Sequence, residues 1–318
     1  MNQILIIQTA FLGDVILATP VVSELKRLFP ESRIDIMVKK GNESLLANNP
    51  KLNEVLTFDK SAGKYKSMRK HIKSFRATKY DLVLNLHRFA SSGLMAGLSK
   101  GKLKYGFKKN PFSFLYTKKF DHTIGDGTHE VERNLSIIQE FGSDKLVRPE
   151  MYPSSSDYDA VKKYQQDPYI CMAPASVWYT KQLPIEKWNE LIEKNKTKNV
   201  FLLGGPTDQE LCSAIVKNHP ETKILSLAGK VTLLQSAALM KNAEHNYVND
   251  SGPLHIASAM NADVTAFFCS TVPSFGFGPL SENSTIKEVK NLDCRPCGLH
   301  GHKECPKGHF DCGKKISI

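Results

Sequence analysis

The chain is expected to fold as two successive α/β domains of the Rossmann-like kind, each built on a largely parallel sheet. Three observations predict this fold class. The length of 318 residues is enough for two domains of about 150 residues, each with its own core. Short apolar runs alternate with helical segments, which favours parallel strands joined by right-handed crossovers. The alternation pauses once, over residues 143–158, and then resumes.

The first half begins with the apolar run 3–8, a turn containing Gly13 and Asp14, and a helical stretch that reaches Phe29. Further strands are expected at 33–38 and 80–86, separated by helical or mixed stretches, and a helix at 129–142 closes this half. The segment 143–158 has two prolines and a serine cluster without sustained periodicity, so it is interpreted as the interdomain linker.

The second half repeats the alternation without a clear sequence repeat. Strands are expected at 168–173, 199–204, 223–228, 246–248 and 263–269, with helices beginning near Pro184, after Pro206, near Val231 and after Gly252. The predicted organisation is therefore a first domain over 1–150, a second over 151–293, and a cysteine-rich tail over 294–318.

The composition is that of an ordinary globular protein, with 41% hydrophobic and 24% charged residues. No apolar run approaches the ~20 residues that a membrane span needs. The N-terminus lacks the basic and apolar regions of an export signal, so a cytoplasmic location is expected.

The net charge of +11 favours polyanionic partners such as nucleic acid, anionic lipid headgroups or phosphorylated substrates. Basic residues cluster between Lys60 and Lys119, with aromatic residues among them. Taken by itself, the cluster is better explained as a solvated basic face. Composition alone does not separate a membrane-adjacent surface from an RNA-binding one.

Asp14 lies between the first strand and its helix, where parallel strands present their carboxyl ends. An aspartate there is typical of an N-cap, which accepts free backbone N–H groups. Pro20 bears on this interpretation, because proline is comfortable only in a first helical turn. A helix beginning at Asp14 would be kinked at Pro20, whereas one beginning near Leu17 would leave Asp14 free over the ligand site.

Two segments of the second half are suited to a diphosphate. Ser176, Thr180 and Lys181 follow a strand, where hydroxyl groups and an ammonium can bind phosphate oxygens. Residues 248–257, VNDSGPLHIA, predict a strand end followed by a helix with Pro253 in its first turn. Amides of Ser251, Gly252 and Leu254 at that helix start would bind anions, with His255 nearby as a donor.

Asp208 follows the glycine turn 202–206 and could accept ribose hydroxyls, or, equally well, be an acid at a helix N-terminus that complements the helix dipole. The chain has neither a GxGxxG fingerprint nor a Walker loop, which weakens dehydrogenase and NTPase interpretations.

Taken together, these segments resemble the ADP-heptose:lipopolysaccharide heptosyltransferases of glycosyltransferase family nine. The resemblance spans nearly the whole chain in order and spacing, and its most specific part is the DSG-x-x-H-x-A-x-A element. It is carried by the opening 4–30 with its Gly-Asp turn, HEVERN (129–134), the loop of Lys181, LLGGPTDQE (202–210), LAGKVTLLQSAALM (227–240) and NDSGPLHIASAM (249–260).

The resemblance implies the GT-B fold, two Rossmann-like domains with a ligand cleft between them, and a role for each matching residue. Asp14 matches the general base, Lys181 a lysine that contacts the phosphates, and Asp208 roughly an acid near the ribose. Asp250, Ser251, Gly252 and His255 match the ADP-heptose-binding segment. Pro253 and Leu254 depart from several relatives, and proline has no N–H to donate.

The implied reaction is an inverting transfer of heptose from ADP-L-glycero-D-manno-heptose to a Kdo- or heptose-bearing lipid A in the inner core of lipopolysaccharide. The base takes the acceptor proton while amides, His255 and Lys181 stabilise the departing ADP. No DxD-like carboxylate pair indicates a catalytic metal, so no cofactor is expected to be required.

The expected location is the cytoplasmic face of the inner membrane, as a peripheral protein that does not act on nucleic acid. Two alternatives stay open: a GT-B transferase or epimerase that uses another nucleotide sugar, and a non-catalytic nucleotide-binding relative.

Cys294, Cys297, Cys305 and Cys312 lie in the tail with three histidines between them. Disulfides are disfavoured in the cytoplasm, and four thiolates can hold a structural zinc ion. The first pair has knuckle spacing and the second does not. Some relatives that resemble heptosyltransferase II carry a similar tail. Cys171, Cys212 and Cys269 lie in apolar contexts and are expected in the core.

Overall fold

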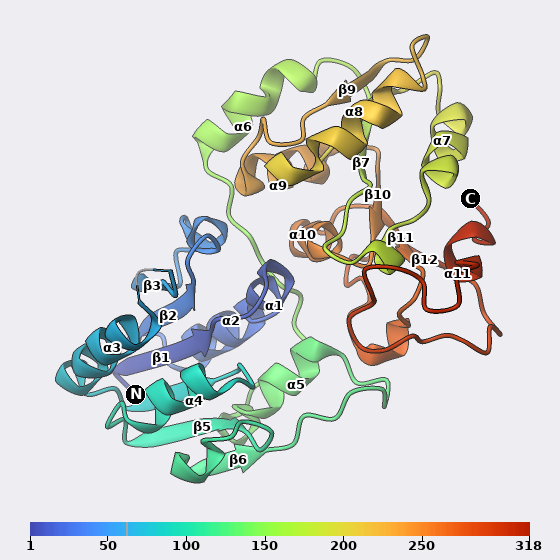
Figure 1. Ribbon diagram of the computed structural model, residues 1–318. Helices are drawn as coiled ribbons and strands as arrows, with labels where there is room; N and C mark the ends of the chain where they lie inside the picture. Colours follow the sequence, from blue (N-terminus) through green and yellow to red (C-terminus); the bar gives the residue numbers. More distant parts are fainter. Residues whose placement is uncertain (62) are drawn as a thin grey trace. The chain divides into compact units, whose positions relative to one another are not determined.

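The computed structural model describes residues 1–61 and 63–318, which form two compact units. The first unit contains Met1–Ile124 and Glu130–Tyr152, and the second contains Gly125–His129 and Pro153–Ile318. Each unit is a parallel six-stranded sheet with helices packed along it (Figure 1).

The first sheet has the strand order β3-β2-β1-β4-β5-β6, and all of its neighbours pair in parallel. Its strands are β1 Gln3–Gln8, β2 Arg33–Lys39, β3 Glu54–Phe58, β4 Leu82–Asn85, β5 Leu103–Phe107 and β6 Lys118–Phe120. Its helices are α1 Leu12–Ile16, α2 Thr19–Leu28, α3 Lys64–Thr78, α4 Ala90–Gly97 and α5 Glu130–Ser136, with 3-10 turns η1 Glu43–Leu46, η2 Ser113–Leu115 and η3 Gln139–Phe141.

The second sheet has the order β12-β11-β10-β7-β8-β9 and is also parallel throughout. Its strands are β7 Tyr169–Ala173, β8 Asn199–Leu202, β9 Ile224–Ser226, β10 His245–Asn249, β11 Val264–Phe268 and β12 Ser284–Glu288. Its helices are α6 Ser155–Val161, α7 Ile185–Lys194, α8 Gln209–Lys217, α9 Leu233–Asn242, α10 Gly252–Met260 and α11 Asp311–Lys314. The 3-10 turns are η4 Lys162–Tyr164, η5 Tyr179–Lys181, η6 Pro206–Asp208 and η7 Pro273–Phe275.

Both orders correspond to the doubly wound 3-2-1-4-5-6 pattern when each unit's strands are numbered separately. The predicted fold class is therefore confirmed as two Rossmann-like units. In this topology the chain reverses its winding between the first and fourth strands. Ligands bind beyond the carboxyl ends of those strands, which are β1 and β4 in one unit and β7 and β10 in the other.

The central strands are buried on both faces, which explains why they appear in the sequence as continuous apolar runs. Residues Ile4 to Ile7 of β1 are fully buried, and every residue of β7 is buried. The cysteine-rich tail contributes to the second core, because Phe310, Cys312 and Ile316 pack with Trp188 of α7.

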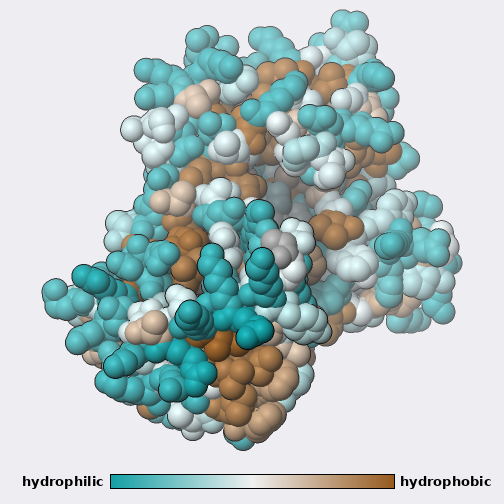
Figure 2. Space-filling model, turned by 60° about the vertical axis from the view of Figure 1, so that its left-hand side comes forward, coloured by the Kyte–Doolittle hydropathy of each residue, from teal (hydrophilic) through white to brown (hydrophobic). Residues whose placement is uncertain are grey.

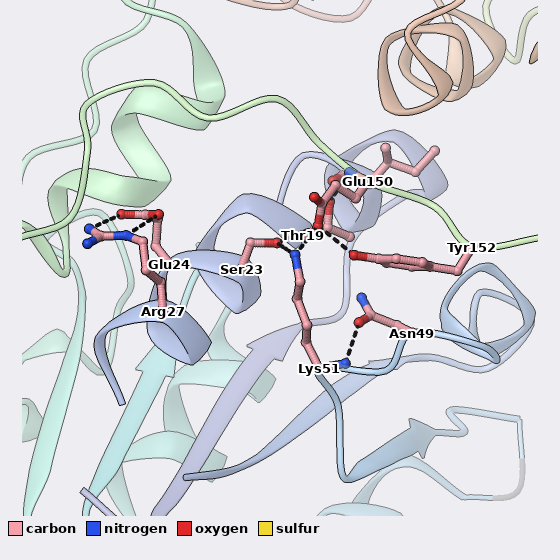
Figure 3. Close-up of polar contacts among 9 residues, drawn as sticks. Thr19, Ser23, Glu24, Arg27, Asn49, Lys51, Glu150 and Tyr152 are labelled. Carbon is pink, nitrogen blue, oxygen red and sulfur yellow. Dashed lines mark hydrogen bonds and ion pairs between the residues drawn. The ribbon is translucent and has the colours of Figure 1, made fainter. Parts of the chain in front are cut away.

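The segment that ends the first unit is tied to α2 by a polar cluster around Glu150 (Figure 3). The Glu150 carboxylate accepts hydrogen bonds from Ser23 and Tyr152, each at 2.7 Å, and pairs with Lys51. Its backbone N–H donates to Thr19 Oγ1 at 3.0 Å. These contacts hold the chain to the first unit until Tyr152, well inside the segment predicted as a linker.

Candidate active site

Asp14 occupies the switch point of the first sheet, on the short helix α1 that follows β1. Phe11, not Asp14, is the N-cap of α1; Asp14 is the third residue of the helix, and its carboxylate caps the helix start by accepting the backbone N–H of Phe11 at 3.1 Å. The chain leaves helical hydrogen bonding after α1 and begins α2 at Thr19, which places Pro20 in a first turn. Two short helices thus reconcile a helical Asp14 with Pro20.

The Asp14 carboxyl group is half-buried and its pKa is raised to about 6. Burial is the largest cause, and the negative charge of Glu130 adds to it. The amide hydrogen bond from Phe11 and the charge of Arg88 act in the opposite direction but do not outweigh them. A carboxylate with such a pKa is a better proton acceptor at neutral pH than an ordinary aspartate.

Glu130 is itself held in a buried polar cluster at the start of α5. His122 Nε2 lies 3.0 Å from one of its carboxylate oxygens, and Arg133 Nε donates to the other at 2.8 Å. Burial would raise the pKa of Glu130, but these two partners outweigh it and hold the pKa below its ordinary value. Glu130 therefore stays ionised and raises the basicity of Asp14.

The sequence marked this segment only as part of a resemblance and assigned no role to Glu130. The sequence feature that could have identified Glu130 is the acid and base, Glu130 and Arg133, in HEVERN (residues 129–134).

Residues after β4 lie at the same switch point as Asp14. His87 is buried, its Nδ1 is 2.9 Å from Thr9 Oγ1, and burial and nearby Lys60 and Arg88 lower its pKa to about 4. His87 is thus neutral at physiological pH. Arg88 lies over the ring of Phe89, which is exposed. This edge presents a cation and an aromatic surface near the Asp14 carboxylate.

Lys181 and Asp250 meet at the switch point of the second sheet. Lys181 Nζ lies 2.7 Å from Asp250 Oδ2, and both side chains are largely buried. Lys181 ends the 3-10 turn η5 in the loop after β7, whereas Asp250 directly follows β10. The sequence predicted both residues as donor-site residues but did not predict that they form an ion pair.

Two neighbours that the sequence did not single out fix this pair. Thr271, after β11, donates its hydroxyl to Asp250 Oδ2 at 2.6 Å. Asn249 is fully buried, donates to Pro174 O at 2.8 Å and accepts the Leu183 N–H at 2.9 Å. Asn249 thereby joins both ends of the Lys181 loop to the end of β10.

The helix α10 begins where the sequence predicted, with Ser251 as N-cap and Pro253 in the first turn. His255 lies in that turn, is buried, and contacts the ring of Phe277 at a centroid distance of 6.5 Å. One expected donor is wrong: the Leu254 N–H already donates to Ser251 O at 3.0 Å. Pro253 has no N–H to donate, so the predicted anion site depends on the backbone amides of Ser251 and Gly252.

Thr180 and Ser176 have different surroundings within the same loop. Thr180 is almost fully buried, and its Oγ1 accepts the His302 N–H from the tail at 2.8 Å. Ser176 is half-buried, and its carbonyl accepts a hydrogen bond from Gln182 at 2.7 Å. The structure therefore places Thr180 against the tail, while a phosphate-binding role for either hydroxyl stays a prediction.

Asp208 caps the turn after β8. Its Oδ2 accepts the Gly205 N–H at 2.7 Å, and its side chain fills the space beside Gly204, where an added Cβ would lie 2.9 Å from Asp208 Cβ. The carboxylate thus stabilises the turn that precedes α8, and it makes no capping hydrogen bond to that helix. Ribose binding by the same half-buried carboxylate stays a prediction.

Burial raises the pKa of Cys312 to about 12, and the neighbouring thiols of Cys297, Cys305 and Cys294 add to the effect, so the four tail cysteines lie near one another. Cys294 Sγ is 3.9 Å from His309 Nε2, and Cys297 Sγ donates to the Cys294 carbonyl at 3.0 Å. Among the described residues, no three cysteine, histidine or carboxylate side chains are grouped to hold a metal ion. Zinc in the tail stays a prediction from the sequence, with Cys294, Cys297, Cys305 and Cys312 as the residues that would hold it. Cys171, Cys212 and Cys269 are buried as expected.

The basic region 60–119 is concentrated on α3, which carries six lysine and arginine residues and no acidic one. Its buried residues are Met68 and Phe75, so the basic side chains cover the outer face. On the face in Figure 2, hydrophobic atoms gather on the lower front, bordered by hydrophilic side chains. Exposed apolar residues of this unit include Phe11, Tyr65, Phe89, Leu98 and Phe114. Across residues 1–61 and 63–318, no helix is long and apolar enough to cross a membrane.

Two doubly wound units, one with a basic carboxylate and the other with a lysine–aspartate pair at its switch point, are typical of enzymes that bind nucleotide-containing ligands. Residues 68–308 match the family model of glycosyltransferase family 9 (heptosyltransferase). The chain belongs to this family and is a glycosyltransferase of the heptosyltransferase type.

Related proteins agree in length and fold. The chain is 31% identical over 293 residues to lipopolysaccharide heptosyltransferase 3 of Escherichia coli K12, covering 85% of this chain and 83% of that protein. A family 9 glycosyltransferase structure from Veillonella parvula matches with a TM-score of 0.81 and 22% identity, over 90% of this chain and 85% of that one.

The structure of E. coli ADP-heptose lipopolysaccharide heptosyltransferase II matches with a TM-score of 0.80 and 21% identity, over 93% of this chain and 96% of that one. These likenesses establish the GT-B fold.

Proposed function

We propose that this enzyme transfers a heptose from ADP-L-glycero-D-manno-heptose to a Kdo- or heptose-bearing lipid A, in the inner core of lipopolysaccharide. The observation that carries the proposal is the half-buried Asp14 carboxyl group at a sheet switch point, with its pKa near 6. Such a group suits a reaction that must remove one proton from a sugar hydroxyl at neutral pH.

In the proposed step, the acceptor oxygen attacks the anomeric carbon of heptose from the face opposite the diphosphate. A bond forms between these two atoms, the bond from the anomeric carbon to the phosphate oxygen breaks, and the configuration inverts. The acceptor proton passes to Asp14, and ADP leaves with the electron pair of the broken bond. The step needs neither an oxidant nor a reductant, and we propose that it needs no metal.

Donor binding is assigned to the switch point of the second sheet. Lys181 offsets the charge that ADP acquires, and the amides of Ser251 and Gly252 donate hydrogen bonds at the positive end of α10. His255 stands in the same turn as a further donor. Asp208 is assigned to the ribose on the strength of the resemblance alone.

Acceptor binding is assigned to the edge formed by Phe11, Arg88 and Phe89. The acceptor carries carboxylate or phosphate groups, which an arginine binds well, and sugar rings pack against aromatic side chains. We further propose that the basic face of α3 holds the enzyme at an anionic membrane surface by electrostatic attraction.

The test is a thermal-shift panel of nucleotide sugars followed by a transfer assay. A true donor stabilises the fold by mass action, so ADP-heptose should raise the melting temperature more than UDP- or GDP-sugars do. A larger shift with another nucleotide sugar would favour the alternative GT-B transferase or epimerase. Binding of ADP-heptose without turnover would indicate a non-catalytic relative.

A further inference from the structure

The cysteine-rich tail contacts the loop after β7, which carries Lys181, and the loop after β11, which carries the Asp250 partner Thr271. Residues 294–302, which we call the strap, make these contacts with their backbone and with Arg295 rather than with sulfur atoms. The family resemblance assigns the strap no part in donor binding.

Arg295 fastens the strap to the ends of β11 and β12. Its side chain is almost fully buried and forms an ion pair with Glu288 at 2.7 Å. The guanidinium also donates to four carbonyl oxygens. They belong to Phe268 at 3.1 Å, Cys269 at 2.6 Å, Thr271 at 2.5 Å and Val289 at 3.0 Å. Arg295 therefore fixes the backbone of Thr271, whose hydroxyl donates to Asp250.

The far end of the strap fixes the Lys181 side. Thr180 and His302 exchange two hydrogen bonds: the Thr180 N–H donates to His302 O at 3.1 Å, and Thr180 Oγ1 accepts the His302 N–H at 2.8 Å. Between these anchors, the Cys297 N–H donates to Ser270 O at 3.0 Å. The strap thus joins the loop after β7 to the loop after β11.

Gly301 shows how closely the strap approaches the lysine. A Cβ added there would lie 3.0 Å from Lys181 Cγ, 3.0 Å from Thr180 Oγ1 and 3.2 Å from Ser270 Oγ. Gly301 also has φ +76, a conformation that favours glycine. The backbone at Gly301 therefore packs against the Lys181 side chain.

We propose that the strap is a positioning element, which sets Lys181 and Asp250 in the geometry that binds the donor diphosphate. The proposal rests on the assignment of these two residues to donor binding. It gives the tail a function that does not depend on metal, and it makes Arg295 and Gly301 positioning residues rather than catalytic ones.

The test compares two glycines of the same tail. Gly301→Ala and Gly308→Ala both place a side chain at φ near +75, so they carry the same backbone strain. An added Cβ at Gly308 meets nothing within 4 Å, whereas at Gly301 it displaces Lys181 and Thr180. Calorimetry with ADP should show Gly301→Ala weakening binding about tenfold or more, with Gly308→Ala near the wild type.

A double-mutant cycle shows whether the strap acts through the lysine. In a Lys181→Ala background, Gly301→Ala should cause little further loss of ADP affinity, because the group it displaces is gone. Equal ADP affinity of the two glycine variants would overturn the proposal, as would full additivity with Lys181→Ala.

If Gly301→Ala does not fold, Arg295→Lys provides the same test, because lysine cannot bridge the four carbonyl groups. The melting temperature of each variant, measured without ADP, separates lost affinity from lost folding. A wild-type protein that does not bind ADP would refute the proposed function instead, and unchanged affinity in Lys181→Ala would remove the donor role of that residue.

Discussion

The pKa of Asp14 leads to a prediction about both rate and stability. Replacing Asp14 by asparagine keeps the side-chain shape and an oxygen that can accept the Phe11 N–H, but removes the proton acceptor. Turnover should fall by about two to four orders of magnitude, with little change in ADP affinity. A variant with near-normal turnover would leave Asp14 as a helix cap only.

The pH dependence of kcat/KM in the wild-type enzyme shows how large the effect of this pKa should be. With a pKa near 6, the fraction of ionised Asp14 is about 90% at pH 7 and about 10% at pH 5, so kcat/KM should fall nearly tenfold between them. An aspartate with its ordinary pKa of 3.8 would remain largely ionised at pH 5. A profile that is flat down to pH 5 would refute the reasoning, provided the fold is intact there.

Stability should change in the opposite direction to activity. The pKa of Asp14 is raised on folding, so its contribution to stability is full below the unfolded pKa of 3.8 and is lost as the pH rises through about 6. The shift of roughly two units corresponds to at most ~3 kcal/mol at neutral pH. Asp14→Asn should therefore raise the melting temperature at pH 7 while it strongly lowers turnover. An aspartate that serves only as a cap would instead show a lower melting temperature with near-normal turnover.

Glu130 provides an independent check on the cause. Glu130→Gln removes the charge that raises the pKa of Asp14, so the acidic limb of the rate profile should move to lower pH. Glu132→Gln is the matched control, because it makes the same change on the same helix at a residue that does not shift Asp14. Equal displacement of both profiles would exclude Glu130 as the cause.

Three further outcomes are expected. Lys181→Ala and His255→Ala should each weaken ADP binding measured by calorimetry, because each removes a hydrogen-bond donor to a phosphate that contributes about 1.5–3 kcal/mol. Unchanged ADP affinity in both variants would show that the diphosphate binds elsewhere. Reversing the charge of Lys66, Arg69, Lys70 and Lys73 should weaken the free energy of binding to anionic vesicles, measured by co-sedimentation, by about 1 kcal/mol per residue, and ADP affinity should not change. If the wild-type protein does not bind these vesicles even at low salt, membrane attachment is refuted. Thiol titration of the native protein as purified should detect Cys294, Cys297 and Cys305 before the four buried cysteines, since burial raises the pKa of Cys212 to about 11 and of Cys312 to about 12. Protection of the first three until a chelator is added would instead support zinc in the tail.

The fold was predictable because its central strands are buried on both faces. Runs such as ILII in β1 and YICMA in β7 have no polar face, which is typical of parallel sheets covered by helices. The strands that were not predicted include the edge strands β6 and β12, whose residues KKF and STIKE are largely exposed. An edge strand needs no apolar pattern, because it has a neighbour on one side only.

The structure shows which lysines of the basic region 60–119 already have partners. Lys102 pairs with Asp81, Lys108 pairs with Asp121, and Lys104 donates to Gly97 O at 3.3 Å. Counting lysines along a sequence does not reveal such partners. The outer face of α3, which lacks acidic residues, is therefore the better site for this test.

Site residues were predicted where one strand end carried a polar group, and missed where several segments must meet. Asp14, Lys181 and Asp250 each follow a strand, so topology alone places them at a switch point. Arg295 follows no such rule. Its role depends on four carbonyl groups from distant segments, and in the sequence it appeared only as a neighbour of two cysteines.

The two aspartates at the switch points show why position does not decide chemistry. Both follow a central strand, and both accept a hydrogen bond. Asp250, however, is neutralised by Lys181 at 2.7 Å and held by Thr271 at 2.6 Å, so its charge is already used to orient the lysine. Asp14 has Glu130 as the strongest nearby charge, which opposes ionisation instead of balancing it. A buried carboxylate that is repelled by a neighbouring negative charge, as Asp14 is, accepts a proton readily. The cap and base interpretations of Asp14 therefore do not compete: the cap fixes where the carboxylate points, and its surroundings make it a base.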